Sequence, residues 1–573
     1  MAPYVVTSVG KGHRRTYERW SSCLVAIVLV VAAGCRESAG EDVTPDGGTS
    51  TGGGEGGTGG PAPIVIDAQP EVDVLFVVDD SATMAEAQRR LAEAADAFFG
   101  ILEDPRDGVD YRIGITTSDN GNVLFCKDTD PEGGRLRVSS CRARPDDFYT
   151  LATAPPTDAF DDVCTPVCPE TLAAFETQPT ATAVDPVPRR RAWIERRSGR
   201  TNLPRGVSPA DAFRCVVPQG IAGCGFESQL EGMWRAIDRS GSPGTPNFGF
   251  RRPGALLAVV VVTDEADCSA DPRFVSIFDP DGNRVFWPDP ETLSLSSAVC
   301  WNAGVSCTGG PGIYDACDPV NKDVDGNEGV DPDDAVLFPV SRYTTDLGLL
   351  GLSVPVEAEA SEVVFAGIVG VPTDYRDVSD IVYQDAADET FQAAFGIGPG
   401  CSADPITAIP PVRIRDVAQA FAWDDGPNLF SICKDAYDDI LAAIARRIVA
   451  RAGRACIDDL PTRPGAGEPE LACTIEDVFP TDFGRERYAV PPCEWTCGGA
   501  PCPPYQSPDG WRFPTGATSC HRLLADAEGR TPTPLDDPST TCVDRGATYE
   551  VRIERKAPAV PGTRTEMVCP VRG

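Results

Sequence analysis

The chain has 573 residues, of which 86 are acidic and 50 are basic, and its formal net charge at pH 7 is −36. Nucleic-acid binding needs basic surface to meet the phosphates, so a chain this acidic is not expected to bind nucleic acid. The length is enough for two or three domains with a sizeable core, and the 53 Pro and 56 Gly residues indicate abundant loops.

Residues 1–34 have the pattern of a bacterial export signal. A basic stretch at 11–19 precedes an apolar run at 23–33, which is short for a membrane span and ends in small residues. The run leads into Ala-Ala-Gly-Cys35, which resembles a lipobox. We therefore expect Cys35 to be lipidated and to become the new N-terminus, with plain secretion as the alternative.

Residues 35–70 follow as a tether rich in Gly, Ser and Thr, a composition that behaves as a flexible linker. Such a tether would hold a folded domain off a membrane. Arg36, rather than an Asp, follows Cys35, which favours anchoring at the outer membrane or cell surface over the periplasmic face of the inner membrane.

The cysteine count agrees with export. Of the 22 Cys, Cys23 lies in the signal and Cys35 is the lipidation candidate, and we expect the other 20 to form disulfides. The sequence does not give their connectivity. A short separation such as that between Cys164 and Cys168 allows a local bridge without requiring one.

Residues 71–452 have the pattern of an α/β domain. Apolar runs without polar alternation predict strands buried on both faces, as in a parallel sheet. The predicted strands are 72–78, 111–117, 256–262 and 362–371, and the predicted helices include 82–102, 414–422 and 436–449. The strand–helix–strand start predicts a doubly wound, mostly parallel sheet.

Two Cys- and Pro-rich insertions, at about 119–220 and 266–355, interrupt this pattern. The first carries arginines around Trp193, which we expect to pair with acidic groups of the same molecule; binding an anionic glycan is the alternative. Residues 453–573 contain frequent Cys and Pro and little helical pattern, which predicts a small, disulfide-rich, β-rich module, with an extended lobe packed on the first domain as the alternative.

Two of the predicted strands end in acidic and hydroxyl residues. Strand 72–78 leads into Asp79-Asp80-Ser81-Ala82-Thr83, and strand 256–262 leads into Thr263-Asp264-Glu265. In open α/β sheets, ligands bind at the carboxyl ends of the strands. Carboxylate and hydroxyl oxygens suit hard cations, so the pattern predicts a divalent-cation site at this edge.

The motif Asp79-x-Ser81-x-Thr83 resembles the Asp-x-Ser-x-Ser signature of von Willebrand factor A (VWA) domains, with Thr in place of the last Ser. Asp264 matches the Asp that follows a later strand of that family. The resemblance implies a metal-ion-dependent adhesion site for Mg²⁺, or for Mn²⁺ or Ca²⁺. It also implies a surface protein that binds a protein or extracellular-matrix ligand through this ion.

The middle ligand departs from the family pattern, which is Gly-x-Thr. Here Gly225-Phe226-Glu227 aligns, so Glu227 stands at the Thr position. Our hypothesis is that Glu227 supplies an extra carboxylate to the ion and weakens the need for an acidic group from a partner. Export signal, tether, domain and Cys-rich tail together resemble VWA surface lipoproteins of myxobacteria and related deltaproteobacteria.

Enzyme functions are less favoured. After removal of the signal the chain keeps one His, His521, which excludes a two-His metalloprotease helix and argues against a Ser-His protease triad. A haloacid dehalogenase-like phosphatase with Asp79 as nucleophile is an alternative, although Ser81 stands where that family has an acid/base carboxylate. A structural envelope protein with a purely stabilising ion is a third possibility.

A second, weaker cation candidate lies in the second insertion. Its spaced oxygen ligands, Asp323, Asp325, Asn327 and Asp331, resemble part of a calcium loop. The stretch lacks the Gly and the bidentate Glu at the sixth and twelfth positions of an EF-hand loop. A solvated acidic loop is the alternative.

Overall fold

The computed structural model describes residues 64–66 and 71–569, which belong to the compact unit Gly60–Gly573. The residues left out within this range are 105–108, 122–125, 127–128, 152, 154, 198, 253–254, 292–294, 351–362, 424–425, 453–455, 458–461, 464–469, 472, 482–483, 502–508, 526–535, 539–541, 544–546 and 557–563. The predicted export signal, Cys35 and all of the tether except 64–66 lie outside the described residues.

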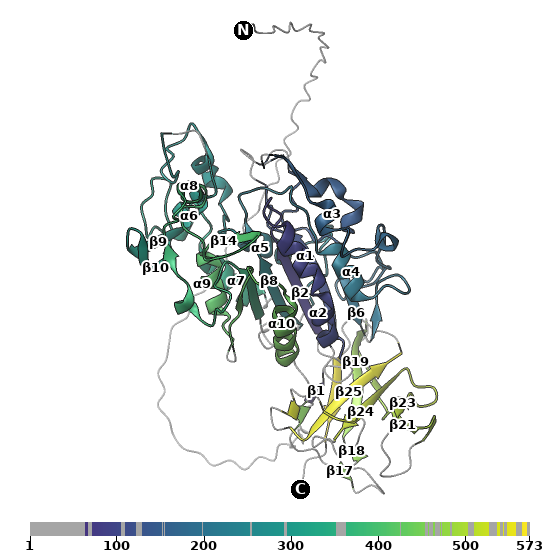
Figure 1. Ribbon diagram of the computed structural model, residues 1–573. Coiled ribbons are helices and arrows are strands. Elements are labelled where there is room, and N and C mark those ends of the chain that lie inside the picture. Colours follow the sequence, from purple (N-terminus) through teal and green to yellow (C-terminus); the bar gives the residue numbers. More distant parts are fainter. Residues whose placement is uncertain are drawn as a thin grey trace, which may run out of the picture. The chain divides into compact units, whose positions relative to one another are not determined.

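A seven-stranded sheet forms the centre of the α/β region, with strand order β15-β11-β8-β2-β3-β6-β7 (Figure 1). Its strands are β2 (Glu71–Val78), β3 (Asp110–Thr117), β6 (Ile194–Arg197), β7 (Arg200–Thr201), β8 (Leu256–Val262), β11 (Val363–Val369) and β15 (Leu429–Ser431). The five strands from β15 to β3 run parallel to one another. β6 pairs antiparallel with β3, and β7 pairs antiparallel with β6. The prediction of a mostly parallel sheet in an α/β protein is confirmed.

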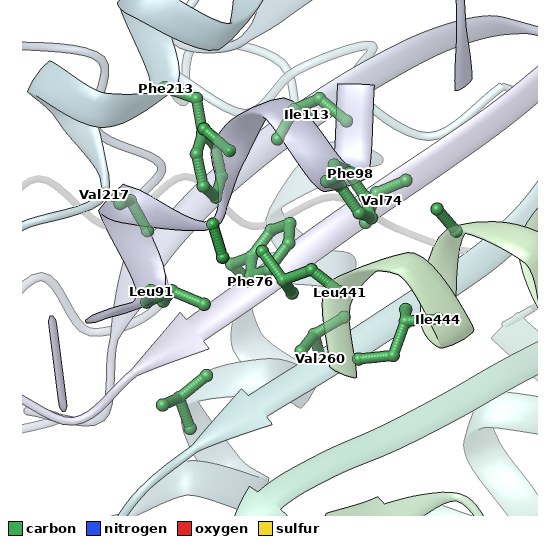
Figure 2. Packing of buried hydrophobic residues seen from close by; sticks show 14 of the residues in the cluster. Val74, Phe76, Leu91, Phe98, Ile113, Phe213, Val217, Val260, Leu441 and Ile444 are labelled. Carbon is green, nitrogen blue, oxygen red and sulfur yellow. The ribbon is translucent and has the colours of Figure 1, made fainter. Parts of the chain in front are cut away.

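Helices cover both faces of this sheet. One face packs against α1 (Ala85–Glu93), α2 (Ala95–Leu102), α4 (Pro209–Val216) and α10 (Asp438–Arg451), and the other against α5 (Gln229–Ser240), α7 (Val340–Leu350) and α9 (Val412–Ala420). Successive side chains of β2 alternate between the two cores, as strand geometry requires. Figure 2 shows Phe76 of β2 among Leu91, Phe98 and Phe213 of three different helices.

The first insertion contributes to the sheet, which the sequence did not indicate. β6 pairs with β3, and the fully buried Arg112 of β3 contacts Glu195 of β6 at 2.7 Å. The sequence Ile-Glu-Arg-Arg is short and charged, so its pattern does not read as a strand. The pairing of Arg112 with Glu195 satisfies two charges that would otherwise be costly to bury, and it exists only in the folded chain.

The remaining elements are short. Those of the two insertions and of the segment after β11 are β4 (Tyr149–Thr150), β5 (Thr157–Asp158), α3 (Phe160–Val163), α6 (Ala298–Gly304), β9 (Val305–Gly309), β10 (Ile313–Pro319), β12 (Tyr383–Gln384), α8 (Glu389–Phe395), β13 (Cys401–Ala403) and β14 (Ile406–Ala408). Short 3-10 turns lie at 141–143, 145–148, 170–172, 272–278, 332–334 and 378–380.

The described part of 453–573 is made of strands, as predicted. β1 (Ile64–Ile66), β26 (Arg564–Val568), β19 (Thr474–Thr481) and β20 (Gly484–Ala489) form one antiparallel sheet, and β16 (Cys456–Ile457), β25 (Tyr549–Arg555) and β24 (Ser519–Leu524) form another. The smaller sheets contain β17 (Thr462–Arg463), β18 (Glu470–Leu471), β21 (Glu494–Cys497), β22 (Ala500–Pro501) and β23 (Gly510–Arg512). His521 is buried in β24, with Nδ1 2.8 Å from the Val490 carbonyl oxygen, and burial lowers its pKa.

Disulfides lie throughout the described residues, and the prediction of extensive pairing is confirmed. The pairs are 126–224, 141–164, 168–215, 268–300, 307–317, 401–433, 456–542, 473–569 and 493–520, and Cys497 is also disulfide-bonded. Cys164 and Cys168 bind other partners, so no local bridge forms between them. Extensive pairing indicates an oxidising, extracytoplasmic compartment.

The arginines around Trp193 pair within the molecule, as expected for the patch. Arg191 lies 2.8 Å from Asp185, and Arg190 lies 2.7 Å from Glu176. Trp193 itself is fully buried. In the described part of the chain, no helix combines the length and apolarity that crossing a membrane requires.

Candidate functional site

The Asp79 carboxylate is held firmly at the tip of β2. Its backbone N–H donates to the Val262 carbonyl at the tip of β8, at 2.9 Å. Its Oδ1 accepts from the Ser81 N–H at 2.8 Å, and its Oδ2 accepts from the Thr263 hydroxyl at 2.5 Å. The side chain is fully buried, and this burial raises the pKa of Asp79.

Ser81 and Thr83 lie in the turn between β2 and α1. Their hydroxyl oxygens are 3.4 Å apart, and Ser81 is buried whereas Thr83 is exposed. The turn therefore places the two predicted hydroxyl ligands next to each other.

Asp264 follows β8 and belongs to the same cluster. Its side chain is buried, and the nearby Thr83 hydroxyl acts to lower its pKa. Burial, together with the nearby Asp79 charge, raises the pKa of Asp264 to about 8. The structure thus brings the predicted first and last parts of the site together.

Glu227 is fully buried beside these residues. Its Oε2 accepts a hydrogen bond from the Ser118 hydroxyl at the end of β3, and its carbonyl oxygen accepts from the Cys268 N–H at 2.6 Å. Burial raises the pKa of Glu227 well above its usual value, and the charges of Asp79 and Asp80 raise it further. Glu227 therefore faces the other acidic groups rather than solvent.

Sequence reasoning did not select two further carboxylates in this cluster. The pKa of buried Asp80 is raised well above its usual value by burial and then by Asp119 and Asp79. The pKa of buried Glu265 is raised well above its usual value by burial and then by Asp79 and Asp264. Both residues adjoin a predicted ligand in the sequence, and that adjacency is the signal that could have identified them.

The cluster contains more buried negative charge than its own groups satisfy. Among the described residues, one carboxylate oxygen each of Asp80, Glu227 and Asp264 is buried without a hydrogen-bond partner. A buried, ionised carboxylate without a partner is costly, so these oxygens favour either protons or a cation. The residues present therefore fit a hard divalent cation chemically.

The arrangement is not a carboxylate-only site. Within the described ranges, no three His, Cys, Asp or Glu side chains are grouped so that they could hold a metal ion. Asp79, Asp264 and Glu227 therefore do not form such a group, and the predicted site depends on the hydroxyls of Ser81 and Thr83 beside the carboxylates of Asp79 and Asp264. The ion and its ligand set stay predictions.

The weaker candidate at 323–331 forms a turn closed by its own hydrogen bonds. Asp323 Oδ1 accepts from the N–H groups of Asp325 and Asn327 at 3.0 and 2.9 Å, and Oδ2 accepts from Asn327 Nδ2 at 2.8 Å. The hydrogen bonds from Asn327 are the largest of the interactions that lower the pKa of Asp323. Asp325, Asn327 and Asp331 are exposed, which favours the solvated-loop interpretation.

Comparisons with known proteins identify no family. No family model and no curated protein matches the chain. The open-conformation pilus adhesin SpaC of Lactobacillus rhamnosus GG is 9% identical, with a TM-score of 0.27 over 88% of this chain and 39% of that chain. The pilus adhesin RrgA of Streptococcus pneumoniae is 9% identical, with a TM-score of 0.21 over 89% of this chain and 57% of that chain. The chain thus spans less than two thirds of either structure, and likeness this distant indicates neither family nor function.

Proposed function

We propose that the chain is an exported, lipid-anchored surface protein that binds a protein or matrix ligand through a divalent cation. The proposed fold is a VWA-type α/β domain. The proposed ligands are Asp79, Ser81, Thr83 and Asp264, with Glu227 as an additional carboxylate. Mg²⁺ is the expected ion, and Mn²⁺ or Ca²⁺ are alternatives. No catalytic role is proposed.

One observation carries the proposal: the buried carboxylates of Asp80, Glu227 and Asp264 each have an oxygen without a hydrogen-bond partner, and the charge of Asp79 at the tip of β2 raises the pKa of all three. A bound cation would neutralise this charge and offer a coordination position to an oxygen of the partner. The chain's own residues orient the site, because the Ser81 N–H and the Thr263 hydroxyl fix the Asp79 carboxylate. Exposed Thr83 marks the side from which a partner would approach.

The phosphatase alternative finds less support in the site. Its acid/base carboxylate would stand at position 81, where the hydroxyl of Ser81 instead lies beside Thr83. The structural-ion alternative differs from the proposal in what chelation does. A stabilising ion affects folding alone, whereas an adhesive ion is needed for ligand binding by protein that is still folded.

The test measures Mn²⁺ binding to the purified protein by electron paramagnetic resonance, and adhesion of cells producing the protein to matrix-coated surfaces. We expect saturable Mn²⁺ binding, and adhesion in Mg²⁺ that EDTA abolishes while circular dichroism shows folded protein. Saturable Mn²⁺ binding without cation-dependent adhesion would favour the structural-ion alternative. Absence of Mn²⁺ binding would refute the cation site.

Glu227→Thr restores the family residue and tests the role of the extra carboxylate. If Glu227 binds the ion, we expect Mn²⁺ affinity to fall at least about tenfold, which corresponds to about 1.4 kcal/mol. Ser118→Ala is the matched control, because it removes the hydrogen bond to Glu227 while keeping the carboxylate. Unchanged affinity in Glu227→Thr would show that Glu227 is not a ligand.

Cys35→Ser tests the anchor. We expect wild-type protein to incorporate radiolabelled palmitate and to partition with membranes, and the variant to lose both properties because it lacks the thiol that is acylated. Cys23→Ser is the control, since Cys23 lies inside the predicted signal and is removed with it. Equal labelling of wild type and Cys35→Ser would contradict the lipobox assignment.

A further inference from the structure

Gln88 is a fully buried amide on α1, beside the candidate cation site. Its Nε2 donates to the carbonyl oxygens of Asp79 at 2.8 Å and Gly220 at 2.7 Å. Its Oε1 accepts from the N–H groups of Gln219 at 2.8 Å and Gly220 at 3.1 Å. These contacts use both donors and both lone pairs of the amide, so only one orientation satisfies its partners.

The four hydrogen bonds join segments that are far apart in sequence. Asp79 is the tip of β2, whereas Gly220 lies 132 residues after Gln88 in the loop that leads to Glu227. The same loop touches the strand tip again, because the Gly223 N–H donates to the Asp80 carbonyl at 2.9 Å. A side chain at Gly223 would not fit, since its Cβ would lie 2.4 Å from Asp80 Oδ1.

From these contacts we propose that Gln88 is the positioning residue of the cation site. Its amide holds the 219–223 loop in register with Asp79, and so contributes to the place of Glu227 relative to the first carboxylate. Asp79 is held on its other side by the Val262 carbonyl. Further along the loop, the Cys126–Cys224 disulfide, the Ser118 hydroxyl and the Cys268 N–H complete the support of Glu227. This inference rests on the proposed function, since it assigns a role toward the ion that the function requires.

Gln88→Met tests the inference, because Met has similar length but makes none of the four hydrogen bonds. We expect Mn²⁺ affinity to fall at least about tenfold under conditions in which circular dichroism shows folded protein. The matched control is Asn247→Leu. Asn247 is also a fully buried amide, which accepts from Leu136 N–H and donates to the Gly134 and Ala236 carbonyls at 2.8–2.9 Å.

A merely structural role for Gln88 would lower the melting temperature of both variants in EDTA and leave Mn²⁺ affinity unchanged in both. We expect Asn247→Leu to lower the melting temperature in EDTA without changing Mn²⁺ affinity. We expect Gln88→Met to lower both the melting temperature and the Mn²⁺ affinity. Equal Mn²⁺ affinity in wild type and Gln88→Met would overturn the inference while leaving the cation site intact. Failure of wild type to bind Mn²⁺ would instead overturn the proposed function, and this inference with it.

Hydrogen–deuterium exchange of the wild type keeps the proposal testable if Gln88→Met does not fold. The amides of Gln219 and Gly220 donate to Gln88, so addition of Mg²⁺ should slow their exchange together with that of Ser81. The Leu136 amide, which donates to Asn247, serves as the internal control and should be unaffected. If Mg²⁺ leaves the exchange rates of the Gln219 and Gly220 amides unchanged, the proposal is overturned.

Discussion

In the absence of divalent cations, the protein should become less stable as the pH rises from about 4 to about 8. The folded-state pKa of Asp264 is about 8 against an ordinary value of 3.8, and those of Asp79, Glu227 and Glu265 are also raised. Between the unfolded and folded pKa values the native state binds more protons than the unfolded state. The free energy of unfolding therefore falls by about 1.4 kcal/mol per pH unit for each group that titrates in this way.

Thermal melts in EDTA at pH 5 and pH 8 measure this effect. We expect a lower melting temperature at pH 8, by an amount equivalent to several kcal/mol, and recovery on addition of Mg²⁺ or Mn²⁺ because a cation replaces the protons. KCl at matched ionic strength is the control, since screening affects these buried groups weakly. A melting temperature that is unchanged or higher at pH 8 in EDTA would contradict the buried acidic cluster.

Asp79→Asn should have the largest effect on cation binding. The amide keeps an acceptor for the Ser81 N–H but removes the charge, so we expect Mn²⁺ affinity to fall at least about 100-fold, or about 2.7 kcal/mol. The same change should raise the melting temperature in EDTA at pH 8, because it relieves repulsion with Asp264 and Glu265. A lower Mn²⁺ affinity together with a higher melting temperature distinguishes loss of a ligand from damage to the fold, which would lower both.

Asp323→Asn is the matched control for this variant. It removes an acidic side chain from the turn at 323–327, whose Asp323 carboxylate accepts hydrogen bonds from Asn327 of the same turn. We expect unchanged Mn²⁺ affinity at the strand-tip site. Comparable losses in Asp79→Asn and Asp323→Asn would mean that cation binding is spread over the acidic surface rather than located at the strand tips.

The sequence by itself determined the mostly parallel sheet and the acidic groups at its edge. The run 256–262 is entirely apolar, and 72–78 is apolar except for Asp73, a pattern typical of strands buried on both faces. Because parallel strands end at the same edge, Asp79 and Asp264 were expected at one edge of the sheet; their closeness follows from the direct pairing of β2 with β8, which only the structure shows. The even number of cysteines after Cys35 likewise predicted extensive pairing, without identifying partners.

The tertiary structure alone decided the features that depend on long-range contacts. β6 joins the sheet by antiparallel pairing with β3, and Arg112 and Glu195 form a buried ion pair across it, which a charged four-residue segment does not reveal. The disulfide partners follow from which loops meet in space. Gln88 likewise reads as an ordinary helical residue, because its role arises from a loop 132 residues away. Local periodicity indicates which face of a helix or strand is buried. Hydrogen bonds and ion pairs between distant segments, in contrast, form only once the chain has folded.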